Sequence, residues 1–397
     1  MSALNAILAV NAGSSSLKFA LYPQDGRDIG AARLSGNIEG LEAGGSPNVK
    51  VSGRDGNSSD TLQAGDGCPH DRALAALDTV LKRHADGIRI TAIAHRIVHG
   101  GERLTESVLL DDDMLAYLTS LSSLAPLHQP HNLAGVRAFR KSFPHLPQIG
   151  CFDTAFHATL PQTEYLFALP QSLREMGIRR YGFHGLSYRY VADRLMEHTA
   201  HARGRAVIAH LGNGASACAV KNGKSIATTM GFSALDGLMM GTRSGEVDPG
   251  VLLHLLRHGW SWEQLERMLY RESGLRGVSG VSADMRTLHA SAEPAARLAI
   301  DIFIHRLVRE CGALSACLEG LDVIAFTGGI GEHDAALRKR TCDALSYLGI
   351  RIDEAANQAA NGDAIAAIHA ADSSVEIWVV PTDEGRVAAQ DAARLIN

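Results

Sequence analysis

One local pattern occurs twice in this chain: two apolar strands joined by a turn of small residues. The first copy consists of residues 7–10, the turn NAGSSS and residues 17–22. The second consists of residues 206–210, the turn GNGAS and residues 218–221, so the two copies lie about two hundred residues apart. Apolar runs joined by glycine and serine are typical of β-hairpins. The repetition favours two related lobes, derived by duplication, that face each other across a cleft.

Length and composition limit the functions that the chain can have. Its 397 residues, 46% of them hydrophobic, are enough for two domains. A formal net charge of −5 is unfavourable for a nucleic-acid or anionic membrane surface, which needs clustered Lys and Arg. There is no basic leader, no run of 18 apolar residues and no C-x-x-C spacing among the six cysteines. We therefore expect a cytoplasmic protein with reduced thiols and a small-molecule ligand, without a nucleic-acid or membrane partner.

A third glycine-rich turn, TGGIGE at residues 327–332, follows a predicted strand at 323–326 and precedes a predicted helix that begins near Asp334. Glycines between a strand and a helix are common at phosphate sites. Two familiar nucleotide motifs are excluded by spacing. The Gly-Lys-Ser at 223–225 has Cys218 where a Walker loop needs its first glycine, and GGIG is not the dinucleotide motif G-x-G-x-x-G. Several short turns from two lobes remain as the way to hold a nucleotide, as in the actin, hexokinase and heat-shock-chaperone superfamily.

Eight motifs then follow one another in order: VNAGSSSLKF, AHRIVHGG, FDTAFH, RRYGFHGLS, AHLGNGAS, MGFSALDGLMMGTRSGEVDPG, SADMR and FTGGIGE. Together they resemble the motifs of the acetate kinase family. The resemblance implies an α/β fold of two similar lobes, the duplicated ribonuclease H-like fold of actin-like ATPases, with a central cleft. It also implies reversible MgATP-dependent phosphorylation of acetate to acetyl phosphate by direct in-line transfer. A homodimer is expected, with Mn²⁺ as an alternative to Mg²⁺.

The remaining local patterns predict single elements. Apolar spacing indicates a helix over 71–85 and strands over 90–98 and 148–152, whereas the polar, glycine-rich stretch 44–67 indicates loops and edge strands. We expect residues 1–152 to form the N-terminal lobe, with residues 385–397 packing back onto it. Residues 153–384 are expected to form the nucleotide-binding C-terminal lobe.

The first serine turn suits phosphoryl oxygens better than a core. Its backbone N–H groups and the hydroxyls of Ser14 and Ser16 are close-range donors, and Lys18 adds a positive charge. By resemblance, Lys18 lies near the nucleotide phosphates, and Asn11 lies near the metal. Glu384 matches the acidic residue expected to reach Mg²⁺.

Arg96 is a candidate for binding a carboxylic acid. Period-two alternation along a strand places Arg96 and Val98 on one face, a guanidinium beside an apolar wall. A structural pairing of Arg96 with a nearby Asp is the alternative. The resemblance extends the wall around the substrate's methyl group to Leu127, Phe183 and Ala234, with His128 nearby.

Arg243 lies between glycines that let the backbone approach a ligand closely, and His184 follows Gly182 in a similar setting. We expect both to stabilise the transferring phosphoryl group while Arg96 holds the acid. Asp153 ends a buried strand. A carboxylic acid with a pKa near 4.3 is already ionised at pH 7, so Asp153 is expected to orient an Arg or metal-bound water rather than act as a base.

The resemblance also assigns the nucleotide contacts. They are His210, Leu211, Gly212, Asn213, Gly214, Asp284, Met285, Arg286, Gly329, Ile330, Gly331, Glu332 and His333. Which side chain of residues 282–286 meets adenine stays open. Asp284 and Arg286 could equally form a local ion pair at a helix start.

Five positions depart from the usual pattern of the family. They are Tyr188 for His, Ala227 for Asp, His333 for Asn, Gly385 for a second Glu, and Ala234 for Pro. Ala234 should leave room for one more methylene, whose burial is worth about 0.8 kcal/mol. We therefore expect a relaxed preference between acetate and propionate.

Three alternatives remain open. The chain could be a kinase that prefers propionate or butyrate, or an actin-like ATPase module without a carboxylate substrate. A sugar kinase needs a carboxylate base for a hydroxyl, and only Asp153 supports it.

Overall fold

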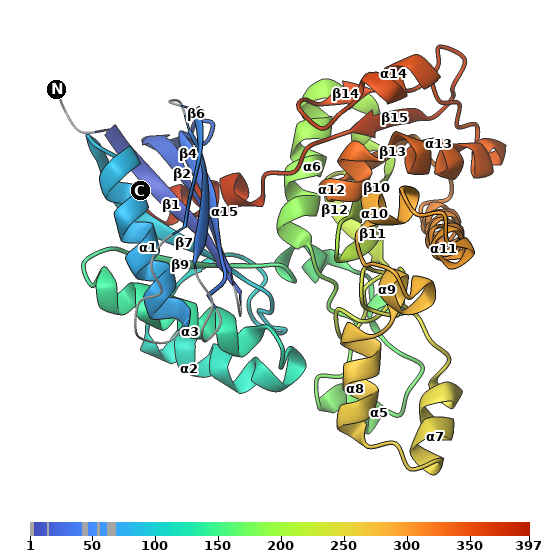
Figure 1. Cartoon of the computed structure of the whole chain (residues 1–397), viewed down its shortest axis with the longest axis horizontal. Coiled ribbons are helices and arrows are strands. Elements are labelled where there is room, and N and C mark those ends of the chain that lie inside the picture. Colours follow the sequence, from blue (N-terminus) through green and yellow to red (C-terminus); the bar gives the residue numbers. More distant parts are fainter. Residues whose placement is uncertain (1–3, 14–15, 42–46, 54–55, 62–68) are drawn as a thin grey trace. The chain divides into compact units, whose positions relative to one another are not determined.

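The computed structural model describes residues 4–397 except 14–15, 42–46, 54–55 and 62–68. The chain divides into two compact units (Figure 1). Unit 1 comprises Met1–Phe156 with Asp383–Asn397, and unit 2 comprises His157–Thr382. The boundaries thus fall at 156/157 and 382/383, where the sequence predicts 152/153 and 384/385. As a result, Asp153 and Glu384 belong to the same unit as Arg96.

Unit 1 is built on a nine-stranded sheet with the order β6-β5-β4-β2-β1-β7-β9-β8, in which β3 pairs with β2. The strands are β1 Leu4–Ala12, β2 Leu17–Asp25, β3 Asp28–Ile29, β4 Leu34–Glu39, β5 Asn48–Gly53, β6 Gly56–Thr61, β7 Ile88–Ile97, β8 Val108–Leu109 and β9 Gln148–Phe152. The helices are α1 Pro69–His84, α2 Asp112–Ser120, α3 Gln129–Ser142 and α15 Glu384–Ile396, with the 3₁₀ turn η1 Leu121–Leu124. The 3₁₀ turn η2 Ala155–Thr159 spans the boundary between the two units. The predicted helix over 71–85 and the strands over 90–98 and 148–152 are confirmed.

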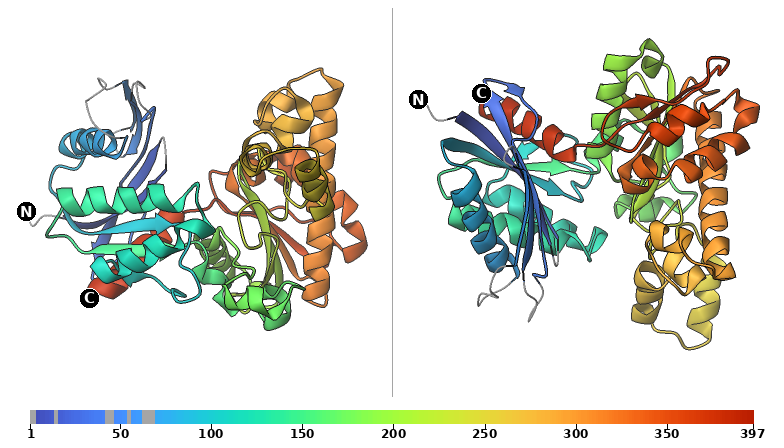
Figure 2. Two further views of the ribbon diagram at one scale, coloured as in Figure 1. Left: turned by 90° about the horizontal axis from the view of Figure 1, so that it is seen from below. Right: turned by 45° about the horizontal axis from the view of Figure 1, so that its top comes forward.

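Strand β1 is buried on both faces, which its apolar sequence makes possible. Leu8 packs in one core with Leu77 of α1 and Phe139 of α3. Ile7 and Ala9 point to the opposite face by strand alternation, and both are buried as well. Helix α15 packs against β1 and β7, so the C-terminal segment covers the sheet of the first unit (Figure 2, right).

Unit 2 contains a six-stranded sheet with the order β12-β11-β10-β13-β15-β14. Its strands are β10 Arg205–Leu211, β11 Ala215–Lys221, β12 Lys224–Thr228, β13 Val323–Thr327, β14 Ala366–Ala367 and β15 Glu376–Val379. Its helices are α4 Gln162–Tyr165, α5 Gln171–Glu175, α6 Gly185–His198, α7 Pro249–Arg257, α8 Trp262–Arg271, α9 Gly274–Ser279, α10 Met285–His289, α11 Pro294–Cys317, α12 Gly328–His333, α13 Ala335–Ala344 and α14 Glu354–Ala359, with 3₁₀ turns η3 Ala200–Arg203 and η4 Ser346–Leu348.

The two sheets share one five-stranded core topology. In unit 1 the order is β4-β2-β1-β7-β9, and in unit 2 it is β12-β11-β10-β13-β15. In both, the first two pairings are antiparallel and the last two are parallel. The hairpin with the serine turn, β1–β2, therefore corresponds to β10–β11, the second copy of the sequence pattern. The predicted α/β class with two similar lobes is confirmed.

At the third glycine-rich turn, Gly328–His333 forms the short helix α12 directly after β13. Gly328 makes this abrupt change of direction possible with a φ of +76°, and a Cβ there would lie 2.8 Å from the carbonyl oxygen of Leu211. The helix predicted near Asp334 is confirmed. Asp334 caps α13 by accepting a hydrogen bond from the Leu337 amide.

The longest helix in the described part of the chain is α11, with 24 residues. It carries several charged side chains. Within the described residues, no helix combines the length and apolar character that a bilayer span needs.

Candidate functional site

In unit 1, Arg96 and Asp153 meet at the carboxyl ends of two parallel strands. Arg96 lies at the end of β7, opposite Cys151 of β9, and Asp153 follows β9 directly. The guanidinium donates from Nε to Asp153 Oδ1 at 2.9 Å and from Nη2 to Oδ2 at 2.6 Å. This bidentate pair is the strongest geometry available to a guanidinium and a carboxylate. The Asp153 side chain is only 1% exposed, so Arg96 compensates a charge that is almost entirely removed from water.

Glu384 approaches the same guanidinium from the first residue of α15. Its Oε2 lies 3.2 Å from Arg96 Nε. Burial alone would lower the pKa of Arg96, but the charges of Asp153 and Glu384 outweigh burial and raise it. The guanidinium therefore stays charged between two carboxylates. We call Arg96, Asp153 and Glu384 the Arg96 cluster.

A pocket of about 150 Å³ lies beside the Arg96 cluster. Asn11 of β1 and Lys18 of β2, which pair across the hairpin, line it together with Arg96 and Glu384. The rest of the wall is Ala9, Val10, Phe19, Ala20, Tyr22, Gly385 and Ala388. An amide oxygen, a carboxylate and two cationic groups thus share one pocket, which suits an anion accompanied by a hard cation.

The serine turn itself is described only in part. Ser16 accepts a hydrogen bond from the Gly13 amide at 2.9 Å through its carbonyl oxygen. Ser14 lies outside the described residues.

In unit 2, His184 lies at the start of α6 in an unusual conformation. Its φ of 58° is left-handed, which costs energy for a non-glycine residue and is most common at functional positions. Nδ1 lies 2.8 Å from Ser216 Oγ of β11. The imidazole stacks on the ring of His210 at 4.3 Å between centroids. His210 is held in turn by Ser187, whose Oγ lies 2.8 Å from Nδ1.

Arg243 and His184 converge on the turn between β10 and β11. A Cβ placed on Gly214 would lie 3.1 Å from Arg243 Nη2 and 3.3 Å from His184 Nε2. The Gly241 amide donates to the Asn213 carbonyl at 3.0 Å, so this turn is tied to the loop that carries Arg243. A cation, an imidazole and a small-residue backbone thus lie together, which is an arrangement suited to phosphoryl oxygens. We call Arg243, His184 and the Gly212–Gly214 turn the His184 cluster.

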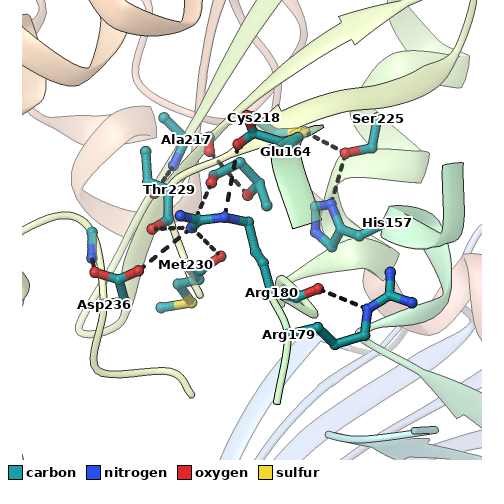
Figure 3. A network of polar contacts seen from close by, with 12 residues as sticks. His157, Glu164, Arg179, Arg180, Ala217, Cys218, Ser225, Thr229, Met230 and Asp236 are labelled. Carbon is teal, nitrogen blue, oxygen red and sulfur yellow. Dashed lines mark hydrogen bonds and ion pairs between the residues drawn. The ribbon is translucent and has the colours of Figure 1, made fainter. Parts of the chain in front are cut away.

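Arg180 supports the loop that follows β12 (Figure 3). Its Nη1 donates to the carbonyl oxygens of Thr228, Thr229 and Met230 at 3.1, 3.3 and 3.0 Å, and lies 3.5 Å from Asp236 Oδ2. Ala234 lies inside this loop, and its carbonyl accepts a hydrogen bond of 2.8 Å from Arg243 Nη1. Arg180 therefore helps to set the position of Arg243.

The Nε edge of the same Arg180 guanidinium faces Glu164, whose Oε1 lies 3.7 Å from Nε (Figure 3). Burial raises the pKa of Glu164, although Arg180 opposes this effect. Sequence reasoning did not single out Arg180. The available signal was its place in the motif RRYGFHGLS, four residues before His184.

Asn132 of α3 was also missed. Its Oδ1 accepts from the Val98 amide at 3.0 Å, and its Nδ2 donates to the Ala12 carbonyl at 2.7 Å. It therefore ties the end of β1 to the residue that follows β7. A buried Asn in an amphipathic helix gives no sequence signal for such a contact.

The residues predicted to surround the substrate's methyl group are divided between the units. Val98, Leu127 and His128 belong to unit 1, whereas Phe183 and Ala234 belong to unit 2. His128 immediately precedes α3, and its amide donates to the Ala125 carbonyl at 3.0 Å.

The predicted nucleotide contacts have different local surroundings. Glu332 Oε1 accepts hydrogen bonds from the amides of Gly328 and Thr382 at 2.8 and 3.1 Å, so its carboxylate stabilises the turn after β13. His333 Nδ1 donates to the Asn361 carbonyl at 2.6 Å. Leu211, Met285 and Gly331 are buried, Gly329 and Asn213 are exposed, and Gly212 and Ile330 are half-buried.

Asp284 and Arg286 form the local ion pair that the sequence left open. Arg286 Nη2 lies 2.8 Å from Asp284 Oδ2, and the Asp284 carboxylate also caps α10 by accepting from the Arg286 and Thr287 amides. Arg286 and these amides lower the pKa of Asp284 to about 2. Arg286 is highly exposed.

Comparison with known proteins identifies one family for this chain. The model described as the Acetokinase family matches residues 6–390. The acetate kinase of Rhodopseudomonas palustris (strain ATCC BAA-98 / CGA009) is 48% identical, with 98% of each chain covered. The acetate kinase of Stutzerimonas stutzeri is 42% identical, with 100% of each chain covered.

Two solved structures are similar over nearly their whole length. The acetate kinase of Porphyromonas gingivalis has a TM-score of 0.89 and 37% identity, covering 99% of this chain and 100% of the other. The propionate kinase of Francisella tularensis has a TM-score of 0.89 and 36% identity, covering 98% and 99%. The α/β fold of both units agrees with these structures.

Proposed function

Since this chain belongs to the acetokinase family, we propose that it transfers the γ-phosphoryl group of ATP reversibly to acetate, forming acetyl phosphate and ADP. The family match over residues 6–390 supports the reaction class. One geometric observation carries the proposal furthest: Arg243 Nη2 and His184 Nε2 both approach Gly214, where the missing side chain leaves room for a phosphoryl oxygen.

The acceptor needs no general base. Acetate is ionised at pH 7, so a carboxylate oxygen attacks the γ-phosphorus directly, while the bond to the β–γ bridging oxygen breaks and its electron pair remains on ADP. Arg96 binds the acid in this proposal. A guanidinium has five N–H donors, of which Asp153 engages two, so three remain for the carboxylate of the substrate. Asp153 orients Arg96 and is not the base.

The phosphoryl group is stabilised by residues of unit 2. In-line transfer spreads negative charge over three equatorial oxygens, so positioned cations and donors lower the barrier. We assign this role to Arg243, His184 and the amides of the Gly212–Gly214 turn. Lys18 supplies a further positive charge from the hairpin of unit 1.

Asn11 and Glu384 would hold Mg²⁺, with Mn²⁺ as an alternative. Both line the pocket beside the Arg96 cluster, and amide and carboxylate oxygens are ligands that Mg²⁺ accepts. Among the described residues, no group of three or more His, Cys, Asp and Glu side chains could hold a metal, so further ligands would come from phosphate and water. When bound, the ion would neutralise phosphate charge.

Acetate is the proposed substrate, with propionate as a second one. Two observations favour this relaxed preference: the small side chain of Ala234 in the loop that holds Arg243, and the similarity to the Francisella tularensis propionate kinase. Discrimination of one methylene by a pocket is about tenfold to two-hundredfold.

We propose a homodimer that uses helix α7 as part of its interface. Val251, Leu253 and Leu256 of α7 are 45–55% exposed, Trp262 at the start of α8 is 66% exposed, and α7 has no buried residue. Apolar surface of this kind is typical of association sites. Light scattering of the purified chain would give twice the monomer mass, and Leu253→Glu would reduce it.

The proposed compartment is the cytoplasm, which agrees with the free thiols of all described cysteines.

Steady-state assays with acetate, propionate and butyrate, with hydroxylamine to trap the acyl phosphate, test the function. Trapped product that depends on both ATP and the acid supports the reaction. A kcat/KM for propionate within about tenfold of that for acetate supports the relaxed preference assigned to Ala234, and a preference of several hundredfold for acetate contradicts it. ATP turnover that does not depend on any acid would instead indicate an ATPase module.

A further inference from the structure

Tyr188 and His184 both contact the hydroxyl group of Ser216. They lie four residues apart, and the Tyr188 amide donates to the His184 carbonyl at 3.0 Å in the first turn of α6. Ser216 Oγ of β11 lies 2.8 Å from His184 Nδ1 and also hydrogen-bonds the Tyr188 hydroxyl. Tyr188 and Ser216 are fully buried. The three side chains therefore form a continuous polar contact inside unit 2.

The proton order along this contact determines what His184 can offer. A serine hydroxyl has one proton to donate and can accept others. If Tyr188 donates to Ser216 and Ser216 donates to Nδ1, the imidazole proton is on Nε2. If the order is reversed, Nδ1 carries the proton and Nε2 has a lone pair. Burial and the nearby Cys218 raise the pKa of Tyr188 well above its usual value, so its hydroxyl keeps its proton.

The surroundings of Nε2 favour the first order. Nε2 faces Gly214, beside Arg243 Nη2. In the proposed function this space holds a phosphoryl oxygen, which only accepts hydrogen bonds. A proton on Nε2 would donate to that oxygen, whereas a lone pair would repel it.

We propose that Tyr188 is a positioning residue that acts through Ser216 to hold His184 with its proton on Nε2, directed at the phosphoryl group. That the Nε2 proton is directed at a phosphoryl group rests on the proposed function. The hydrogen-bond order itself is a property of the protein without ligand. The sequence marked Tyr188 only as a departure from the His common in the family, and the contact gives this departure a function.

Nitrogen NMR of the ligand-free protein labelled with ¹⁵N-histidine tests the order directly. The His184 signal, assigned by its loss in His184→Gln, should show a protonated Nε2 and an unprotonated Nδ1. In Tyr188→Phe the two tautomers should mix. A protonated Nδ1 in the native protein, or the same tautomer in Tyr188→Phe, would overturn the proposal.

Kinetics supply the second readout. Tyr188→Phe should lower kcat about 10- to 100-fold, the range for partners that orient an imidazole, with the KM values for ATP and acid nearly unchanged. Ser216→Ala should have the same effect, and the double variant should be no worse than either single one. Tyr188→His supplies a ring N–H that can donate to Ser216 in place of the tyrosine hydroxyl, so its kcat should be higher than that of Tyr188→Phe. Additive losses in the double variant would contradict a relay through Ser216.

Tyr181→Phe is the matched control. Tyr181 is a buried tyrosine of the same unit, and its hydroxyl donates to the Gly177 carbonyl at 2.9 Å. Its removal should leave kcat and the His184 tautomer unchanged. If the native protein shows the expected tautomer but forms no acyl phosphate, the proposed function fails while the hydrogen-bond order stands. Ser216→Ala provides the test if Tyr188→Phe does not fold.

Discussion

Arg96 and Asp153 depend on each other unequally. The Asp153 side chain is 1% exposed, whereas Arg96 is 25% exposed and has Glu384 as a second partner. Arg96→Ala would remove the guanidinium that pairs with this buried carboxylate, and breaking such a buried pair costs about 3–5 kcal/mol. We predict that Arg96→Ala lowers the free energy of unfolding by about that amount and that Asp153→Ala lowers it less. Urea unfolding of both variants measures the difference.

An exposed pair supplies the control for this asymmetry. Arg140 Nη1 lies 2.6 Å from Asp112 Oδ1, and the Asp112 side chain is 93% exposed. Asp112→Ala should change the free energy of unfolding by less than about 1 kcal/mol. An equal loss in Arg96→Ala and Asp153→Ala would show that burial does not govern the Arg96 cluster.

Arg243 is expected to act on turnover more than on binding. Its positive charge is needed most when negative charge spreads over the transferring phosphoryl group. Arginine residues in this role raise kcat by about 10³–10⁵-fold. We predict that Arg243→Ala lowers kcat about a thousandfold while the KM for the acid changes little. Steady-state kinetics measure both, and circular dichroism checks that the variant is folded. Unchanged turnover would remove Arg243 from the proposed mechanism.

Among the elements, the start of α15 depends on one close contact. The Tyr22 hydroxyl donates to Asp383 Oδ1 at 2.5 Å, and Asp383 caps α15 by accepting from the Arg386 amide at 3.0 Å. A Cβ on Gly385 would lie 2.5 Å from the Tyr22 oxygen and 3.2 Å from its ring. Gly385 thus gives the Tyr22 hydroxyl access to the cap beside Glu384.

This contact reverses the usual effect of replacing a helical glycine. Ala is favoured over Gly by about 1 kcal/mol in a helix. We nevertheless predict that Gly385→Ala destabilises the protein, because its Cβ would collide with the Tyr22 hydroxyl. In a Tyr22→Phe background the same substitution should be neutral or stabilising. A thermal unfolding cycle of the four proteins measures this change of sign, and stabilisation by Gly385→Ala with Tyr22 present would contradict it.

At the same scale, sequence patterns succeeded where the determining contacts are local. The strand over residues 148–152 and the helix start at Asp334 depend on neighbouring residues, and both are confirmed. In the glycine-rich turn after β13, Gly328–His333 forms the short helix α12. Its helix depends on the Glu332 carboxylate, which accepts from the amides of Gly328 and of the distant Thr382, and no local pattern reveals the second contact.

For the whole molecule, buried histidines predict sensitivity to acid. Burial lowers the pKa values of His95, His99 and His157 to about 4, against about 6.5 in an unfolded chain. Between pH 6.5 and 4 the unfolded chain therefore binds protons that the folded chain does not. Each such histidine should reduce the free energy of unfolding by up to about 1.4 kcal/mol per pH unit in this range as the pH falls.

Urea unfolding at several values between pH 7.5 and 4.5 measures this dependence. The urea concentration at the midpoint of unfolding should decrease as the pH falls below 6.5. It should decrease less steeply for His157→Asn than for the native protein. The salt-bridged Asp284, with a pKa of about 2, contributes only at lower pH. A midpoint that stays constant or rises between pH 6.5 and 4.5 would exclude neutral buried histidines as the cause.

The sequence by itself determined that the chain has two similar α/β lobes and belongs to one family, because hairpin turns and ordered motifs act within short segments. It also directed attention to Arg96, His184 and Arg243. Only the tertiary structure decided their partners. Asp153 and Glu384 reach Arg96 from distant segments, and Ser216 of β11 reaches His184 at the start of α6, because strand register and helix packing bring them together. Those contacts decide which charged and polar groups are neighbours, which no spacing along the chain encodes.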